Sequence, residues 1–218
     1  MRRLLWIFGL FLLLALAAAA LYGFKGYLDA RSDGAGLRTR ADRLIADGRG
    51  PDALGPGRAE AVLKVQDPGY RDHSGVDFTT PGAGLTTLTQ SLAKRLAFEH
   101  FKPGIGKIRQ TGYALGLEQE LDKTQIYALW LDTLEMGNGP DGWMTGFFLA
   151  SQSIYRKQPA DLSDAEFQAL VAVLIAPGRY DLRAPSEDLR ERVRRIDRLV
   201  AGECAPADHG DVWLDGCA

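Results

Sequence analysis

The chain has 218 residues, of which 46% are hydrophobic and 25% charged; this composition is ordinary for a globular protein and excludes disordered and collagen-like chains. Its 26 basic residues are balanced by 28 acidic ones, so it has no basic excess with which to bind nucleic acid. The length suits one domain of medium size with an appendage.

The appendage is an uncharged run over residues 4–24, preceded by Arg2 and Arg3 and followed by Lys25. As a helix this run would extend about 31 Å, which matches the hydrocarbon core of a bilayer. We therefore predict a transmembrane anchor over residues 1–25, with the arginines in the cytoplasm and the rest of the chain outside. The alternative is a signal peptide cleaved near the small residues 18–20. Both interpretations export the domain.

Export bears on the two cysteines, Cys204 and Cys217, which lie in a polar tail over residues 202–218. An oxidising compartment would let them form a disulfide, and two unrelated free thiols are the alternative. A zinc site is disfavoured because His209 is the only nitrogen ligand close in sequence. Without the three basic residues that flank the anchor, the chain has 23 basic and 28 acidic residues, and so no polybasic surface for anionic lipid.

After the anchor, a juxtamembrane segment over residues 26–57 contains a predicted short helix (37–45) and a loop rich in Gly and Pro (47–57). Apolar residues at helical spacing then predict helices, and no alternating strand of useful length occurs. The predicted inward stripes are Leu88, Leu92, Leu96 and Phe101; Ile105, Ile108, Gly112 and Leu115; Ile126, Leu129, Trp130, Thr133 and Leu134; and Phe147, Phe148, Ser151 and Ile154.

The last two predicted helices complete a domain over residues 58–201. A capping box from Ser163 to Glu166 begins the first of them, which Pro177 and Gly178 end. The second runs over about residues 186–200, and its arginines at 190, 192, 194, 195 and 198 are expected on a solvated face. Trp130, Trp143, Phe147 and Phe148 are expected in the core. The fold class is therefore mostly α.

Four polar clusters separate the helices and carry the informative residues. They contain Gln66, Asp67, Tyr70, His73 and Gly75; then Gly84, Thr86, Thr87, Thr89, Gln90 and Lys94; then Lys107, Arg109, Gln110, Ala114, Leu117 and Glu118; and last Trp130, Leu131, Asp132 and Gly137.

On these clusters, the chain from about residue 59 to residue 200 resembles the family 51 glycosyltransferases. These are the peptidoglycan polymerases that occur alone or as the transglycosylase domain of bifunctional penicillin-binding proteins. The resemblance implies a lysozyme-like helical fold on a single-pass anchor in the inner membrane, with the domain in the periplasm. It also implies a reaction that joins the 4-hydroxyl of one lipid-linked disaccharide-peptide, lipid II, to the anomeric carbon of another and releases undecaprenyl pyrophosphate.

The expected partners are therefore the membrane, lipid II or a glycan strand, and other proteins of cell-wall synthesis, with no nucleic acid. A divalent cation, Mg²⁺ or Mn²⁺, at the pyrophosphate is the one cofactor that this chemistry would admit. By resemblance, the residues that bind substrate are His73, Thr86, Thr87, Gln90, Lys94, Lys107, Arg109 and Glu118.

The chain departs from the family at the positions that move protons. Gln66 stands where the family has the glutamate taken as general base on the acceptor hydroxyl, and Gln110 where a second glutamate helps on the leaving side. Gly106 replaces an arginine, and the segment between His73 and Thr86 is shorter than in typical members. An amide keeps the size and hydrogen-bonding capacity of a carboxylate but cannot take the proton, and a general base contributes about 10²- to 10⁴-fold.

Two interpretations remain open. In the first, the protein is a weakened polymerase in which Asp67, Asp72 or Glu118 supplies the missing carboxylate. Lys94 with Lys107 or Arg109 would then stabilise the pyrophosphate. In the second, it is a non-catalytic pseudoenzyme that binds lipid II or glycan strands as a scaffold or regulator. A lysozyme-like hydrolase is disfavoured because cleavage normally uses a pair of carboxylates.

Structural roles compete with the binding roles at several candidates. We prefer a structural hydrogen bond for His73. Thr86, Thr87 and Gln90 could cap the helix that follows them, and Lys94 could be an ordinary surface lysine. Glu118 is expected to support the groove from behind.

Overall fold

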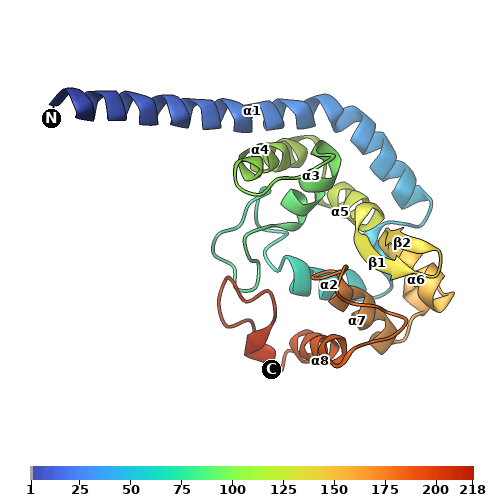
Figure 1. Cartoon of the computed structure of the whole chain (residues 1–218). Helices are drawn as coiled ribbons and strands as arrows, with labels where there is room; N and C mark the ends of the chain where they lie inside the picture. Colours follow the sequence, from blue (N-terminus) through green and yellow to red (C-terminus); the bar gives the residue numbers. More distant parts are fainter. Residues whose placement is uncertain (1) are drawn as a thin grey trace.

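The computed structural model describes residues 2–218 and is mostly helical (Figure 1); Met1, the first residue of the predicted anchor, lies outside this range. The helices are α1 (Arg2–Ala46), α2 (Arg58–Gln66), α3 (Leu88–Ala97), α4 (Ile105–Glu120), α5 (Lys123–Thr133), α6 (Phe147–Tyr155), α7 (Asp164–Val173) and α8 (Glu187–Ala201). Three short 3₁₀ helices are η1 (Pro51–Leu54), η2 (Pro159–Asp161) and η3 (Asp215–Cys217). The strands β1 (Glu135–Gly139) and β2 (Gly142–Thr145) form an antiparallel hairpin.

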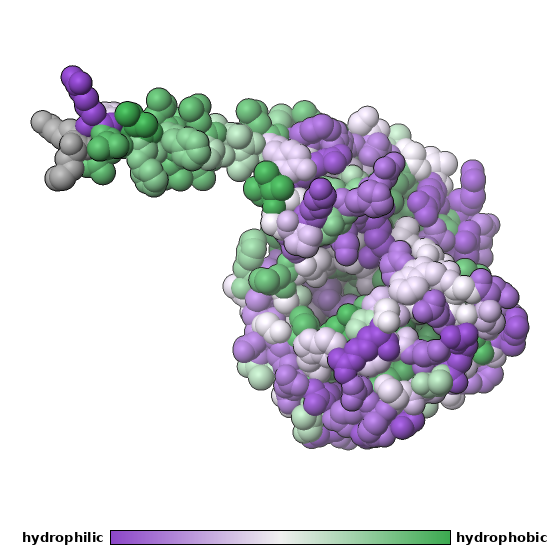
Figure 2. Space-filling view, in the orientation of Figure 1, coloured by the Kyte–Doolittle hydropathy of each residue, from purple (hydrophilic) through white to green (hydrophobic). Residues whose placement is uncertain are grey.

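Helix α1 is continuous through the predicted anchor and most of the juxtamembrane segment. Residues 37–45 are helical as predicted, but they belong to α1 and do not form a separate short helix. The first half of α1 is a hydrophobic rod that projects from the domain (Figure 2) and is long and apolar enough to cross a membrane. Its second half packs on α4 and α5. Gly26 and Gly34 lie within this helix and pack closely on α4, Gly26 against Arg109 and Gly34 against Glu120.

The stripe of Ile105, Ile108, Gly112 and Leu115 faces α1 and the surface, which corrects its predicted place in the core. A Cβ atom at Gly112 would lie 1.8 Å from the carbonyl oxygen of Gly23, so the two helices approach backbone to backbone. The three larger side chains flank this contact and are exposed. The glycines thus let α1 lie directly against α4.

Core packing follows the sequence pattern in α5, α6 and α7. Trp130 and Phe147 are fully buried, and Ser163 and Glu166 form the predicted capping box at the start of α7. Trp143 is the exception, because it lies half-exposed on β2 and donates to Glu135 across the hairpin. The hairpin escaped prediction because its strands are short and glycine-rich.

The arginines of α8 are not all solvated, which also corrects a prediction. Arg192 is 3% exposed, whereas Arg195 and Arg198 donate to backbone carbonyls of the tail at Trp213 and Cys217. The tail itself is ordered, and the structure joins Cys204 and Cys217 in a disulfide. Arg195 and Arg198 thus hold the tail against α8.

Candidate functional site

Gln66 ends α2 and lines a cavity of about 550 Å³. The other lining residues are Val65, Gly82, Ala83, Gly84, Leu85, Thr86, Ile175, Arg192, Gly210 and Val212. Figure 2 shows the middle of this face of the molecule hollowed. Within residues 2–218, the lining offers an amide, a hydroxyl and a guanidinium, but no carboxylate.

Gln110 lies on the buried face of α4 and does not line that cavity. Its side-chain Nε2 donates to the carbonyl oxygen of Gln90 over 2.7 Å, and only 1% of the residue is exposed. Its Oε1 is buried and accepts no hydrogen bond from the residues that the structure describes. Only Gln66 is therefore open to a ligand, and the two glutamines do not line a common cavity.

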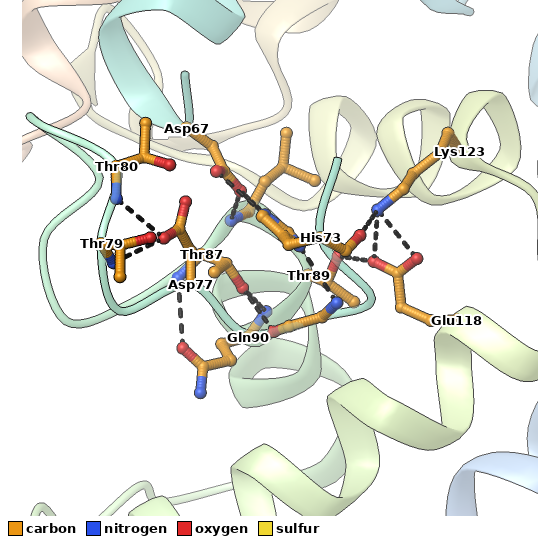
Figure 3. Close-up of polar contacts among 12 residues, drawn as sticks. Asp67, His73, Asp77, Thr79, Thr80, Thr87, Thr89, Gln90, Glu118 and Lys123 are labelled. Carbon is orange, nitrogen blue, oxygen red and sulfur yellow. Dashed lines mark hydrogen bonds and ion pairs between the residues drawn. The ribbon is translucent and has the colours of Figure 1, made fainter. Parts of the chain in front are cut away.

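Asp67 is fully buried and its carboxylate is committed to the fold (Figure 3). It accepts from the backbone N–H of Leu88 over 2.6 Å and lies 3.0 Å from Nε2 of His73. The N–H of Gly75 donates to Nδ1 of His73, which leaves the ring proton on Nε2 for Asp67. Asp67 and His73 thus hold the loop before α3 onto the first turn of that helix. Asp72, the other early carboxylate candidate, is exposed.

Glu118 is held as the acceptor of a second buried network (Figure 3). Its carboxylate accepts from Thr89 over 2.5 Å and pairs with Nζ of Lys123 at 2.9 Å, and 6% of its side chain is exposed. Lys123 also donates to the carbonyl oxygen of His73 over 2.7 Å. Sequence reasoning missed Lys123, because its position at the start of α5 gives no sign that it reaches α4 and the His73 loop.

Thr87 and Gln90 form the capping box that begins α3. The Thr87 hydroxyl also donates to the carbonyl oxygen of Gly75 over 2.7 Å, and the Gln90 amide donates to Thr111 over 3.0 Å. Both side chains are buried, whereas Thr86 reaches the cavity. Thr87 and Gln90 therefore hold the start of α3 in place without facing the cavity, whereas Thr86 can contact a ligand.

The three predicted cations separate into two groups. Lys107 donates to the carbonyl oxygen of Leu85 over 3.0 Å and to the Thr86 hydroxyl. Burial and the nearby charge of Lys94 lower the pKa of Lys107. Arg109 instead pairs with Asp29 of α1 at 2.8 Å. Lys107 thus contacts the cavity residue Thr86, Lys94 lies over the ring of Phe101, and Arg109 pairs with α1.

At position 106, where the family has an arginine, the space for a side chain is filled by Phe101. Gly106 is buried, and a Cβ atom there would approach the ring of Phe101 to 3.3 Å. A divalent cation finds no obvious ligands: across residues 2–218, no group of three or more His, Cys, Asp or Glu side chains is placed to hold one. We therefore derive no step through a metal ion.

Comparison with known proteins shows the family to which the chain belongs. The sequence model of the family described as Transglycosylase matches residues 51–200. The chain belongs to this transglycosylase family. The match covers nearly all of the domain predicted over residues 58–201 and includes the cavity residue Gln66, both lysines and α8 except Ala201. The disulfide-closed tail lies outside it.

Relatives of this transglycosylase carry consistent names. The "Biosynthetic peptidoglycan transglycosylase" of Citrobacter koseri is 30% identical over 174 residues, which cover 72% of this chain and 70% of the relative. The protein of the same name from Chromobacterium violaceum is 28% identical over 163 residues, with coverage of 69% and 70%. "Penicillin-binding protein 2D" of Bacillus subtilis is 28% identical over 160 residues, which are 67% of this chain and 23% of the relative.

Proposed function

We propose that this transglycosylase binds the lipid-linked disaccharide-peptide precursor of peptidoglycan, lipid II, and polymerises it at least about a hundredfold more slowly than members with a glutamate at position 66. The family match and the names of the relatives support the substrate class. The observation that carries the reduced rate is the cavity at Gln66, whose lining among the described residues includes no carboxylate.

The chemistry of that cavity explains the reduced rate. Glycosyl transfer removes a proton from the acceptor hydroxyl as the new C–O bond forms, and a carboxylate in contact with that hydroxyl accepts the proton. The amide of Gln66 can orient the hydroxyl by hydrogen bonding but cannot take its proton at neutral pH. Binding is retained while the proton transfer goes uncatalysed, because the two depend on different properties of the side chain.

The neighbouring carboxylates do not replace the missing base in this proposal. Asp67 is fully buried and bonded to Leu88 and His73, and Glu118 is paired with Lys123. Each carboxylate would have to give up the hydrogen bonds that hold α3 before it could reach a sugar hydroxyl. We therefore assign both residues structural roles.

The leaving side of the site keeps its positive charge. Lys94 and Lys107 lie close enough for their charges to interact, and Lys107 is bonded to the cavity residue Thr86. Fixed cations of this kind stabilise a pyrophosphate in both the bound ground state and the transition state. They support precursor binding whether or not transfer follows.

The anchor fits a substrate that has a lipid tail. We place the apolar half of α1 in the inner membrane, its N-terminal arginines in the cytoplasm and the domain in the periplasm. Contact between Gly23 and Gly112 fixes α4, and with it the cations near α3, against this helix. A precursor held in the same membrane could reach the cavity without leaving the bilayer.

The alternative function is non-catalytic. In it the protein binds the same precursor without polymerising it and serves as a scaffold or regulator that works with other proteins of wall synthesis. Full-length protein in detergent micelles, titrated with fluorescent lipid II and followed for chain growth on gels, tests both parts. We expect saturable binding that Lys94→Gln weakens and the control Lys102→Gln, at an exposed lysine, leaves unchanged. Failure to bind lipid II would overturn the proposal, and shortening of purified sacculi would assign the protein to the hydrolases.

A further inference from the structure

The tail beyond the family match forms a loop, residues 204–217, that bridges α8 and the segment before α3 (Figure 1). The N–H of Gly82 donates to the carbonyl oxygen of Asp208 over 2.9 Å, and the N–H of Gly84 donates to that of His209 over 2.8 Å. From the other side, Arg195 and Arg198 donate to the loop's backbone. We call residues 204–217 the C-terminal loop.

This loop is fixed internally as well as at both edges. The carboxylate of Asp211 accepts from the N–H groups of Ala207, Asp215 and Gly216, over 2.9, 2.7 and 2.9 Å. The disulfide closes its ends. Gly84 has a φ of +64°, and a Cβ atom there would lie 2.5 Å from Val212, so the loop packs directly on the backbone that enters α3.

Gly210 and Val212 of the C-terminal loop form part of the wall of the 550 Å³ cavity that Gln66 lines. The same cavity is lined by Arg192, which α8 supplies. The loop therefore completes a pocket in which the amide of Gln66 and the guanidinium of Arg192 are the main polar groups.

Arg192 is a buried cation without a bonding partner. Only 3% of the residue is exposed, and its Nε and Nη1 are buried with no acceptor among residues 2–218. Burial lowers the pKa of this guanidinium to about 10. A buried charged donor is costly unless an acceptor satisfies it, so such a group points to a missing anionic ligand.

The carboxylates around Arg192 are engaged elsewhere. Asp211 is occupied by its three backbone N–H groups, and Asp215 pairs with Arg195. Arg192 also lines a smaller cavity of 210 Å³ that contains two acidic residues. Of these, Asp188 pairs with Arg179, and Glu191 pairs with Arg194 and Arg195. Every nearby acid thus already has a cation or N–H partner of its own.

We propose that the cavity between Gln66 and the C-terminal loop binds an oxyanion, a phosphate or a carboxylate group, through the guanidinium of Arg192. The planar, permanently charged guanidinium suits either group, because both present two oxygens to its fork of N–H donors. Only the natural source of the anion rests on the proposed function. That source would be the pyrophosphate of the lipid-linked precursor or a carboxylate of its sugar-peptide part. The disulfide-closed loop supplies the wall without which the pocket opens to solvent.

Calorimetric titration of the full-length protein in detergent micelles tests the proposal with two probes, inorganic pyrophosphate and N-acetylmuramic acid. We expect one probe to bind, and to bind at least tenfold more weakly to Arg192→Gln. Arg194→Gln is the matched control, since Arg194 lies exposed on the same helix and pairs with Glu187 and Glu191. Binding of pyrophosphate identifies a phosphate site, and binding of the sugar acid identifies a carboxylate site.

Two further variants keep the test decisive if Arg192→Gln unfolds. Val212→Trp fills the pocket from the loop, and the pair Cys204→Ser with Cys217→Ser releases the loop; both leave Arg192 in place, and we expect both to weaken binding. The proposal is overturned if neither probe binds the wild type, or if the variants that fold bind as tightly as it does. Lost lipid II binding with intact probe binding would contradict only the proposed function.

Discussion

The carboxylate of Asp67 accepts a hydrogen bond from the backbone N–H of Leu88 over 2.6 Å, directly beside Gln66 in the chain. Gln66 and Asp67 therefore have different roles, since Gln66 lines the cavity and Asp67 links the end of α2 to the start of α3. The carboxylate next in sequence to Gln66 is thus committed to the fold and does not line the cavity.

Asp67→Asn should destabilise the fold by about 1–3 kcal/mol, because an amide cannot accept from both the Leu88 N–H and the His73 ring with equal geometry. Urea unfolding in detergent measures this change. Asp72→Asn is the control, because Asp72 is exposed, and it should change the free energy of unfolding by less than about 0.5 kcal/mol. Equal effects of the two substitutions would refute the structural role of Asp67.

Gln110→Glu should also destabilise the protein, by about 1–3 kcal/mol, because it places a carboxylate against the carbonyl oxygen of Gln90 in a buried site. The exposed Gln119 of the same helix provides the matched control, Gln119→Glu, which should be neutral. Thermal unfolding of the two variants makes the comparison. A Gln110→Glu variant as stable as the wild type would show that this side chain can turn outward.

Gly112→Ala should separate α1 from α4, since its Cβ atom would meet the carbonyl oxygen of Gly23 at 1.8 Å. Overpacking of this kind costs about 1–3 kcal/mol. Gly36→Ala in α1 meets open space and should instead stabilise the helix by about 0.5–1 kcal/mol. Opposite shifts of the thermal midpoint are expected, and shifts of the same sign would contradict the described helix contact.

Asp77 should make stability depend on pH in the acid range. Burial acts to raise the pKa of its carboxyl, but hydrogen bonds from Thr80 and Thr79 outweigh it and lower the pKa from 3.8 to about 2. A depressed pKa stabilises the folded state at pH values above 3.8, and this contribution is lost as the pH falls toward 2. Asp77→Asn should therefore flatten the unfolding free energy in that window, and an unchanged slope would rule out the assignment.

Local sequence signals predicted the elements whose formation depends on neighbouring residues. The capping boxes at Thr87 and Ser163 and the buried stripe around Trp130 are of this kind, because caps and periodicity act within a few residues. Of the motif positions, Gln66 and Thr86 line a cavity, and Lys107 is bonded to Thr86.

Long-range packing decided what the sequence did not predict. Arg192 lies on the same face of α8 as the buried Leu189 and Ile196, whereas Arg194 lies exposed, so periodicity could have placed Arg192 inward. The sequence could not show that the C-terminal loop forms a cavity wall beside it. The close approach of Gly23 in α1 to Gly112 in α4 likewise depends on residues far apart in the sequence. Gln110 and Gln66 both occupy motif positions, yet Gln110 is buried because it lies on the inward face of α4.

The rate of lipid II polymerisation by the wild type and by Gln66→Glu, both full length in detergent, tests the account most directly. The account predicts a wild-type rate at least about a hundredfold below that of a relative with glutamate at this position, and a clear gain for Gln66→Glu, since a general base contributes about 10²- to 10⁴-fold. Gln119→Glu controls for added charge. A wild-type rate equal to that of the relative would contradict the account.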